Sequence, residues 1–171
     1  MRARTLLVLL LLSACGREPP PVQVGGLPPS VLDLNLIERA GGDPARALIA
    51  RLHPGPLAPA ESEVGFYGSG DRRAVLYVSR FASADTAHAQ LAMMAAMIGR
   101  GRGGFGHHTE VAIGGTAVHA TLGQGRAHFF YTRGAEVVWL AADPAIARPA
   151  LAELLSVPLD SIPHADPPGG G

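Results

Sequence analysis

Histidine is the residue type in this chain whose spacing most suggests chemistry. Of the seven histidines, four lie between positions 107 and 128, where short glycine-containing turns separate runs rich in Val, Phe and Tyr. This pattern predicts antiparallel strands joined by two-residue hairpin loops. In such a hairpin the residue numbers of any two paired positions add up to the same odd number. The residues that face each other can therefore be derived from the sequence.

The first hairpin places two histidines and a glutamate close together. With Gly114-Gly115 as the loop, His119 lies opposite Glu110, and Thr121 lies opposite His108. Directly opposed residues have Cβ atoms about 4.5–5.5 Å apart. Their side chains therefore share one face of the sheet.

The next turn leaves two registers open. If Gly123-Gln124 is the loop, His128 lies opposite His119, and if Gln124-Gly125 is the loop, it lies opposite Thr121. In both registers one face carries three imidazoles and a carboxylate: His108, Glu110, His119 and His128.

This histidine face has two interpretations. Imidazole and carboxylate groups at such distances could converge on a Zn or Cu ion. Histidines on a partly solvated sheet face also form hydrogen bonds with their neighbours and then need no ligand, and this is the interpretation we favour. No cofactor is then expected, and a Zn or Cu site is the alternative.

Two large aromatic residues, Phe130 and Trp139, are predicted on the same face. The opposite face has the apolar side chains that covering helices need, so it is the predicted core. The mixed character of the histidine face suggests that short N-terminal helices cover part of it, or that Phe130 and Trp139 line a shallow ligand site.

No motif in the chain predicts catalysis. The string Gly101–Gly106 matches G-x-G-x-x-G, but the dinucleotide-binding motif follows a strand and opens a helix, whereas this string follows a predicted helix. Gly68-Ser69-Gly70 lacks the upstream glycine of a nucleophile elbow. A non-catalytic domain is therefore expected.

The N-terminal residues have the pattern of an export signal. Arg2 and Arg4 precede an apolar run, Leu6–Leu12. As a helix this run spans about 10 Å, against about 30 Å for a bilayer core, so it fits a signal peptide and is too short for a transmembrane anchor.

The four residues Leu12-Ser13-Ala14-Cys15 resemble the lipobox of bacterial lipoproteins at all four positions. The resemblance implies that the Cys15 thiol receives diacylglycerol, that the chain is cleaved before Cys15, and that acyl chains such as palmitate anchor the protein to a membrane. Lipoproteins of two-membrane bacteria are commonly kept in the inner membrane by Asp after this cysteine. Here that residue is Gly16, which implies the outer membrane, facing the periplasm, if the source has two membranes.

The charge balance and the cysteine count narrow the function classes. The chain has 14 basic and 14 acidic residues, which excludes a nucleic-acid binder that works by strong electrostatic attraction. Cys15 is the single cysteine, so no disulfide is expected in the mature domain. The expected partners are the membrane, through the lipid on Cys15, and an envelope protein or small ligand.

We expect an α+β fold with the element order ααββαββββα. Helices are predicted at 31–40, 43–52, 83–98 and from 144 to just before Pro158, and strands at 63–68, 74–81, 107–113, 116–122, 126–133 and 136–142. The strands form a hairpin and a four-strand meander in an antiparallel sheet of about six strands, with the two longer helices on one face.

The expected organisation is a signal peptide at 1–14, a proline-rich tether at 15–29, one domain at 30–158 and a disordered tail at 159–171. We expect a lipid-anchored envelope lipoprotein with a small non-catalytic accessory or binding domain. The alternative is a periplasm-facing lipoprotein that binds Zn or Cu through the histidine face.

Overall fold

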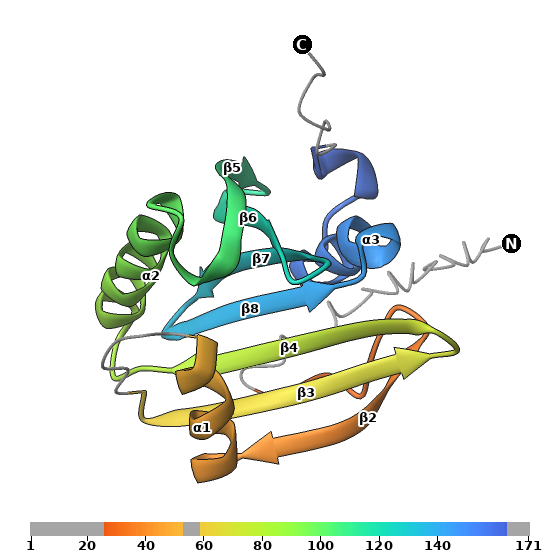
Figure 1. The fold of residues 1–171 in the computed structure, drawn as a ribbon, viewed down its shortest axis with the longest axis horizontal. Helices are drawn as coiled ribbons and strands as arrows, with labels where there is room; N and C mark the ends of the chain where they lie inside the picture. Colours follow the sequence, from red (N-terminus) through yellow and green to blue (C-terminus); the bar gives the residue numbers. More distant parts are fainter. Residues whose placement is uncertain (1–25, 53–58, 164–171) are drawn as a thin grey trace, which may run out of the picture.

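The computed structural model describes residues 26–52 and 59–163 of the chain and has an α+β fold, with one eight-stranded antiparallel sheet and three α-helices (Figure 1). The strand order across the sheet is β1-β2-β3-β4-β8-β7-β6-β5. The strands are β1 Ser30–Val31, β2 Leu34–Gly41, β3 Glu61–Ser69, β4 Arg72–Arg80, β5 Phe105–Ile113, β6 Thr116–Gly123, β7 Arg126–Arg133 and β8 Glu136–Ala142, and the helices are α1 Gly42–Leu52, α2 Ala84–Gly99 and α3 Pro144–Leu155. The expected meander is present as β5–β8, and the sheet has two more strands than expected.

The local signals at helix α2 act as predicted. The Ser83 side chain accepts a hydrogen bond from the Thr86 backbone N–H, which caps the first turn. After the helix, Gly101 has a left-handed φ of 73°, a conformation that favours glycine. The segment Gly101–Gly106 is thus a connection from α2 to β5, and not a dinucleotide motif.

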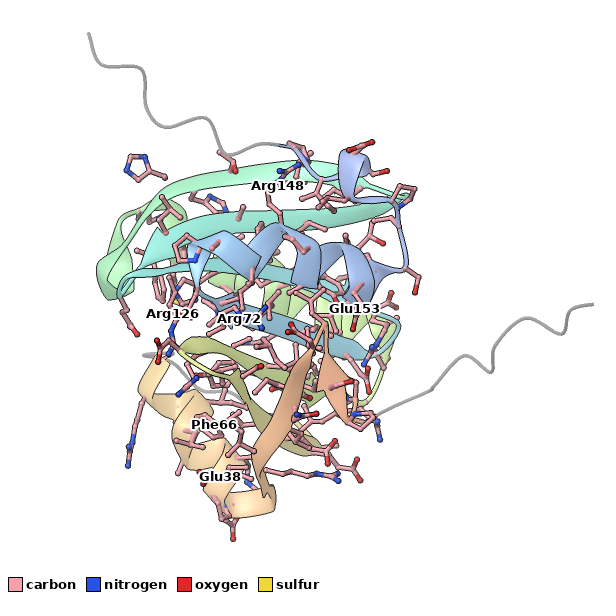
Figure 2. All side chains as sticks on the ribbon, turned by 90° about the vertical axis from the view of Figure 1, so that its right-hand side faces the viewer. Glu38, Phe66, Arg72, Arg126, Arg148 and Glu153 are labelled. Carbon is pink, nitrogen blue, oxygen red and sulfur yellow. The ribbon has the colours of Figure 1, made fainter. Side chains whose placement is uncertain are left out.

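The helix predicted at 31–40 is wrong. Val31 and Leu34 have helical spacing, but the chain turns at Leu32, whose φ is 55°, and continues as β2 paired with β3. The Leu32 N–H donates to the Glu153 carboxylate of α3, which lies close to this turn in Figure 2. Pairing with β3 and contacts with α3 override a weak helical pattern.

The expectation that both longer helices cover one face is also wrong. Helices α2 and α3 lie on opposite sides of the β5–β8 part of the sheet, and α1 lies in front of β3 (Figure 1). One core cluster lies under α3 and includes Val118, Tyr131 and Leu140, and the other includes residues of α1 and α2 with Phe130 and Trp139. The histidine face is therefore covered mainly by α2, with α1 in the same core cluster; of the two alternatives for this face, cover by short N-terminal helices applies only to α1.

The folded region extends past both expected boundaries. Leu27 packs against the core, and the Pro28 carbonyl accepts a hydrogen bond from Tyr67 Oη at 2.9 Å. At the other end Leu159–Ser161 forms a 3-10 turn, and Ile162 is 2% exposed. Residues 27–29 and 159–162 thus belong to the domain, whereas Cys15 lies outside the described residues. Within the described ranges, no helix combines the length and the apolar character needed to cross a bilayer.

An ion-pair row ties together the ends of three central strands. Glu136 of β8 is 6% exposed and accepts hydrogen bonds from Arg80 of β4 and Arg133 of β7, each with one N–O distance of 2.8 Å. Burial alone would raise the pKa of Glu136, but the hydrogen bonds from both arginines outweigh it and lower the pKa. The carboxylate is therefore held in its charged form.

We expect Glu136→Gln to lower the free energy of unfolding by about 2 kcal/mol, because charge-assisted bonds to two arginines are lost in a buried position. Urea unfolding at neutral pH measures this. Glu61 pairs with the same Arg80, but its side chain is 68% exposed, so Glu61→Gln is a matched control with an expected cost below about 1 kcal/mol. Equal losses in the two variants would contradict the argument from burial.

Candidate functional site

The strand register decides between the two alternatives for His128. Gln124 and Gly125 form the loop, with φ of 52° and 74°, so His128 lies opposite Thr121. His119 lies opposite Glu110, as predicted. The histidine face is therefore built in the second of the two predicted registers.

Strand β5 departs from the predicted pairing at one point. The register shifts between Gly106 and Thr109, with His107 at a φ of 55°, so His108 is not paired with Thr121. The Thr121 hydroxyl instead donates to the Gly106 carbonyl at 2.7 Å. A β-bulge of this kind adds an unpaired residue, which simple hairpin arithmetic does not include.

Four stacked rings cross the sheet on this face, one from each strand of the meander. The centroid distances along the row are 5.3 Å for His108–His119, 4.9 Å for His119–Phe130 and 4.8 Å for Phe130–Trp139, all with interplanar angles below 20°. Phe130 is fully buried at 0% exposure. It therefore supports the neighbouring rings from within the core and has no surface for a ligand.

His128 is fixed beside this row by hydrogen bonds at both ring nitrogens. Its Nδ1 accepts from the indole Nε1–H of Trp139 at 3.0 Å, and its Nε2–H donates to the Gly123 carbonyl at 3.0 Å. Because an indole only donates and a carbonyl only accepts, these partners require the neutral imidazole with its proton on Nε2. Burial lowers the pKa of His128 and favours the same form.

The metal-site residues are only partly brought together. His108 Nε2 lies 3.3 Å from His119 Nδ1, and the Glu110 carboxylate lies 3.7 Å from that same nitrogen. His128 uses both of its nitrogens elsewhere. In residues 26–52 and 59–163, no three His, Cys, Asp or Glu side chains are grouped so as to hold a metal ion.

A pocket of about 270 Å³ opens next to His128. Trp139 and Ala141 of β8, Tyr77 of β4 and His128 contribute to its lining, and the remaining lining residues are Gln124 and Arg126 at the β6–β7 turn. Tyr77 and Trp139 are directly paired across β4 and β8. The pocket is therefore aromatic on one side and polar at the turn.

Arg126 supplies a positive charge at the pocket and affects the pKa of two other lining residues. Burial raises the pKa of Tyr77, and the positive charge of Arg126 lowers it in part. The same charge adds to burial in lowering the pKa of His128. The phenol and the imidazole therefore stay neutral around a permanent cation.

The comparisons with known proteins give no family for this chain: no family model matches it, and neither the curated proteins nor the solved structures contain a significant match. The function must therefore be argued from the site. Of the residues that line the pocket, Trp139 and His128 follow from the hairpin pattern, whereas Tyr77, Gln124 and Arg126 were not predicted. The proximity of Gln124 and Arg126 to the predicted turn could have indicated that they lie near His128. No sequence pattern indicated that β4 pairs with β8, which is the pairing that places Tyr77 in the pocket.

His128 and His119 should make the domain sensitive to mild acid. Burial lowers the pKa of each, whereas an unfolded histidine titrates near 6.5. The unfolded state then binds more protons, so the free energy of unfolding falls as pH drops below about 6.5. Urea unfolding at pH 7.5 and at pH 5 measures this loss.

His128→Gln should weaken this pH dependence, because the variant lacks one of the two buried imidazoles. His88 is exposed on α2, and His88→Gln is the control that should keep the full dependence. An unchanged pH dependence in His128→Gln would show that His128 is not a source of acid sensitivity.

Proposed function

We propose that this chain is a lipid-anchored protein of the cell envelope whose α+β domain binds a small ligand without reacting with it. The observation that carries the binding part is the pocket at Tyr77, His128 and Trp139. Aromatic walls with a few placed polar groups are typical of small-molecule sites.

The lipobox supports the location. Cys15 would hold the lipid, and Gly16 favours the outer membrane, facing the periplasm, in a two-membrane source. Residues from Cys15 to Leu27, where the packed region starts, can reach at most about 40 Å when extended. The domain would therefore work close to the membrane surface.

The state of the pocket side chains supports binding over catalysis. His128 would be the natural general base, but its Nδ1 lone pair already accepts from Trp139. Tyr77, with its pKa raised by burial, remains a neutral phenol. The pocket thus offers ring faces and hydrogen-bonding groups, which orient a ligand without activating it.

A screen of small fragments tests this proposal. Trp139 is the single tryptophan of the chain and lines the pocket, so its fluorescence reports on the site. Full-length protein in detergent micelles is titrated with anionic, neutral and cationic one-ring compounds. We expect saturable changes in Trp139 emission for at least one charge class, and no response to any class would overturn the binding proposal.

A further inference from the structure

Arg126 lines the pocket and has no acidic partner among the described residues. Five other described arginines pair with carboxylates: Arg39, Arg46, Arg72, Arg80 and Arg133. Arg126 is half-buried, and no described carboxylate forms an ion pair with it. A partly desolvated guanidinium gains most from an anion that it binds through two N–H groups.

The position of Arg126 directs that anion into the pocket. Arg126 is the first residue of β7, and it lines the pocket with Gln124 of the preceding turn. Figure 2 shows Arg126 on the same side of the molecule as α1, and its charge reaches both Tyr77 and His128. One end of the pocket is therefore cationic and carries an amide.

The other end suits a flat ring. Tyr77 and Trp139 are cross-strand neighbours that both line the pocket, and of the two it is the half-buried Tyr77 that offers a ring surface, because Trp139 is only 3% exposed. A dry cavity of about 150 Å³ holds one benzene ring. A pocket of about 270 Å³ therefore accommodates a single ring with a carboxylate.

We infer that the ligand of this pocket is a small aromatic or conjugated carboxylate, whose anionic group is held by Arg126 and Gln124 and whose ring lies against Tyr77, next to the buried Trp139. This inference rests on the proposed binding function and assigns a chemical class to its ligand. Neutral Tyr77 and His128 add no negative charge that would repel such an anion.

Benzoate, benzyl alcohol and acetate separate the two parts of the recognition. The three probes are titrated into full-length protein in micelles, with Trp139 emission as the signal. Benzoate should bind at least tenfold more tightly than benzyl alcohol, which lacks the charge, or acetate, which lacks the ring. Equal responses to benzoate and benzyl alcohol would overturn the inference.

Arg126→Gln should weaken benzoate binding about tenfold or more and leave benzyl alcohol unaffected. Arg51→Gln is the control, because Arg51 is exposed on α1 and does not line the pocket. A circular dichroism melt confirms that both variants fold. If Arg126→Gln is folded and binds benzoate as the original protein does, the assignment of the anion site is wrong.

The results also separate this inference from the proposal on which it rests. Binding of neutral or cationic rings alone would overturn the carboxylate assignment and leave the binding function standing. No response to any ring compound would overturn both. Benzoate binding that depends on Arg126 supports both.

Discussion

Replacing Phe130 with alanine is expected to lower the free energy of unfolding by about 3–5 kcal/mol. Phe130 is fully buried and stacks between His119 and Trp139, at centroid distances of 4.9 and 4.8 Å. The substitution removes the ring and leaves a cavity in the centre of the row, which the rigid strands close only in part. Urea or thermal unfolding at neutral pH measures the loss.

Leu122→Ala is the control for this substitution. Leu122 lies on the neighbouring strand β6 and is 42% exposed, so its truncation should cost less than about 1 kcal/mol. A loss below about 1 kcal/mol for Phe130→Ala would show that the row of rings is not a packed part of the core.

Cys15→Ser is expected to release the protein from membranes and to leave an uncleaved precursor. In the proposed lipobox the thiol of Cys15 is the lipid acceptor, and a serine hydroxyl would not replace it. Each buried methylene of an acyl chain contributes about 0.8 kcal/mol, and two or three chains give stable anchoring. Membrane fractionation and immunoblotting measure both the location and the size of the chain.

Ser13→Ala is the matched control, because alanine is also favoured at this lipobox position. This variant should remain anchored and processed. If Cys15→Ser still fractionates with membranes as a processed chain, the lipoprotein assignment fails.

The parts of the fold set by neighbouring residues were predictable. The Gly114-Gly115 turn has φ of 55° and 83°, and the hairpin it makes follows from the sequence. Ser83 marks the start of α2 correctly. In such places a few adjacent residues determine the backbone, so no knowledge of distant contacts is needed.

The errors concern contacts between distant segments. Residues 34–41 form a strand because β3 pairs with them, and the partner cannot be identified from their own pattern.

The second buried face of the sheet did leave a signal in the sequence. All seven residues of β8, Glu136–Ala142, are buried, and the apolar run from Val137 is typical of a strand covered on both sides. That run predicts helices on both faces.

Part of the candidate site was also predictable from the sequence. Hairpin pairing placed His119, His128, Phe130 and Trp139 on one face, as observed. It could not show that Trp139 occupies one nitrogen of His128, because that contact depends on side-chain rotamers. Nor could it place Tyr77 beside Trp139, since β4 and β8 are far apart in the chain.

The claim that this chain is a lipid-anchored protein is tested most directly by the mass of its N-terminal peptide. The protein is purified from membranes in its source or a bacterial host, digested, and analysed by mass spectrometry. We expect a mature chain that begins at Cys15 and carries diacylglycerol on the thiol, with or without an acyl group on the new amino terminus. A chain that begins at another residue, or a Cys15 without lipid, would contradict it.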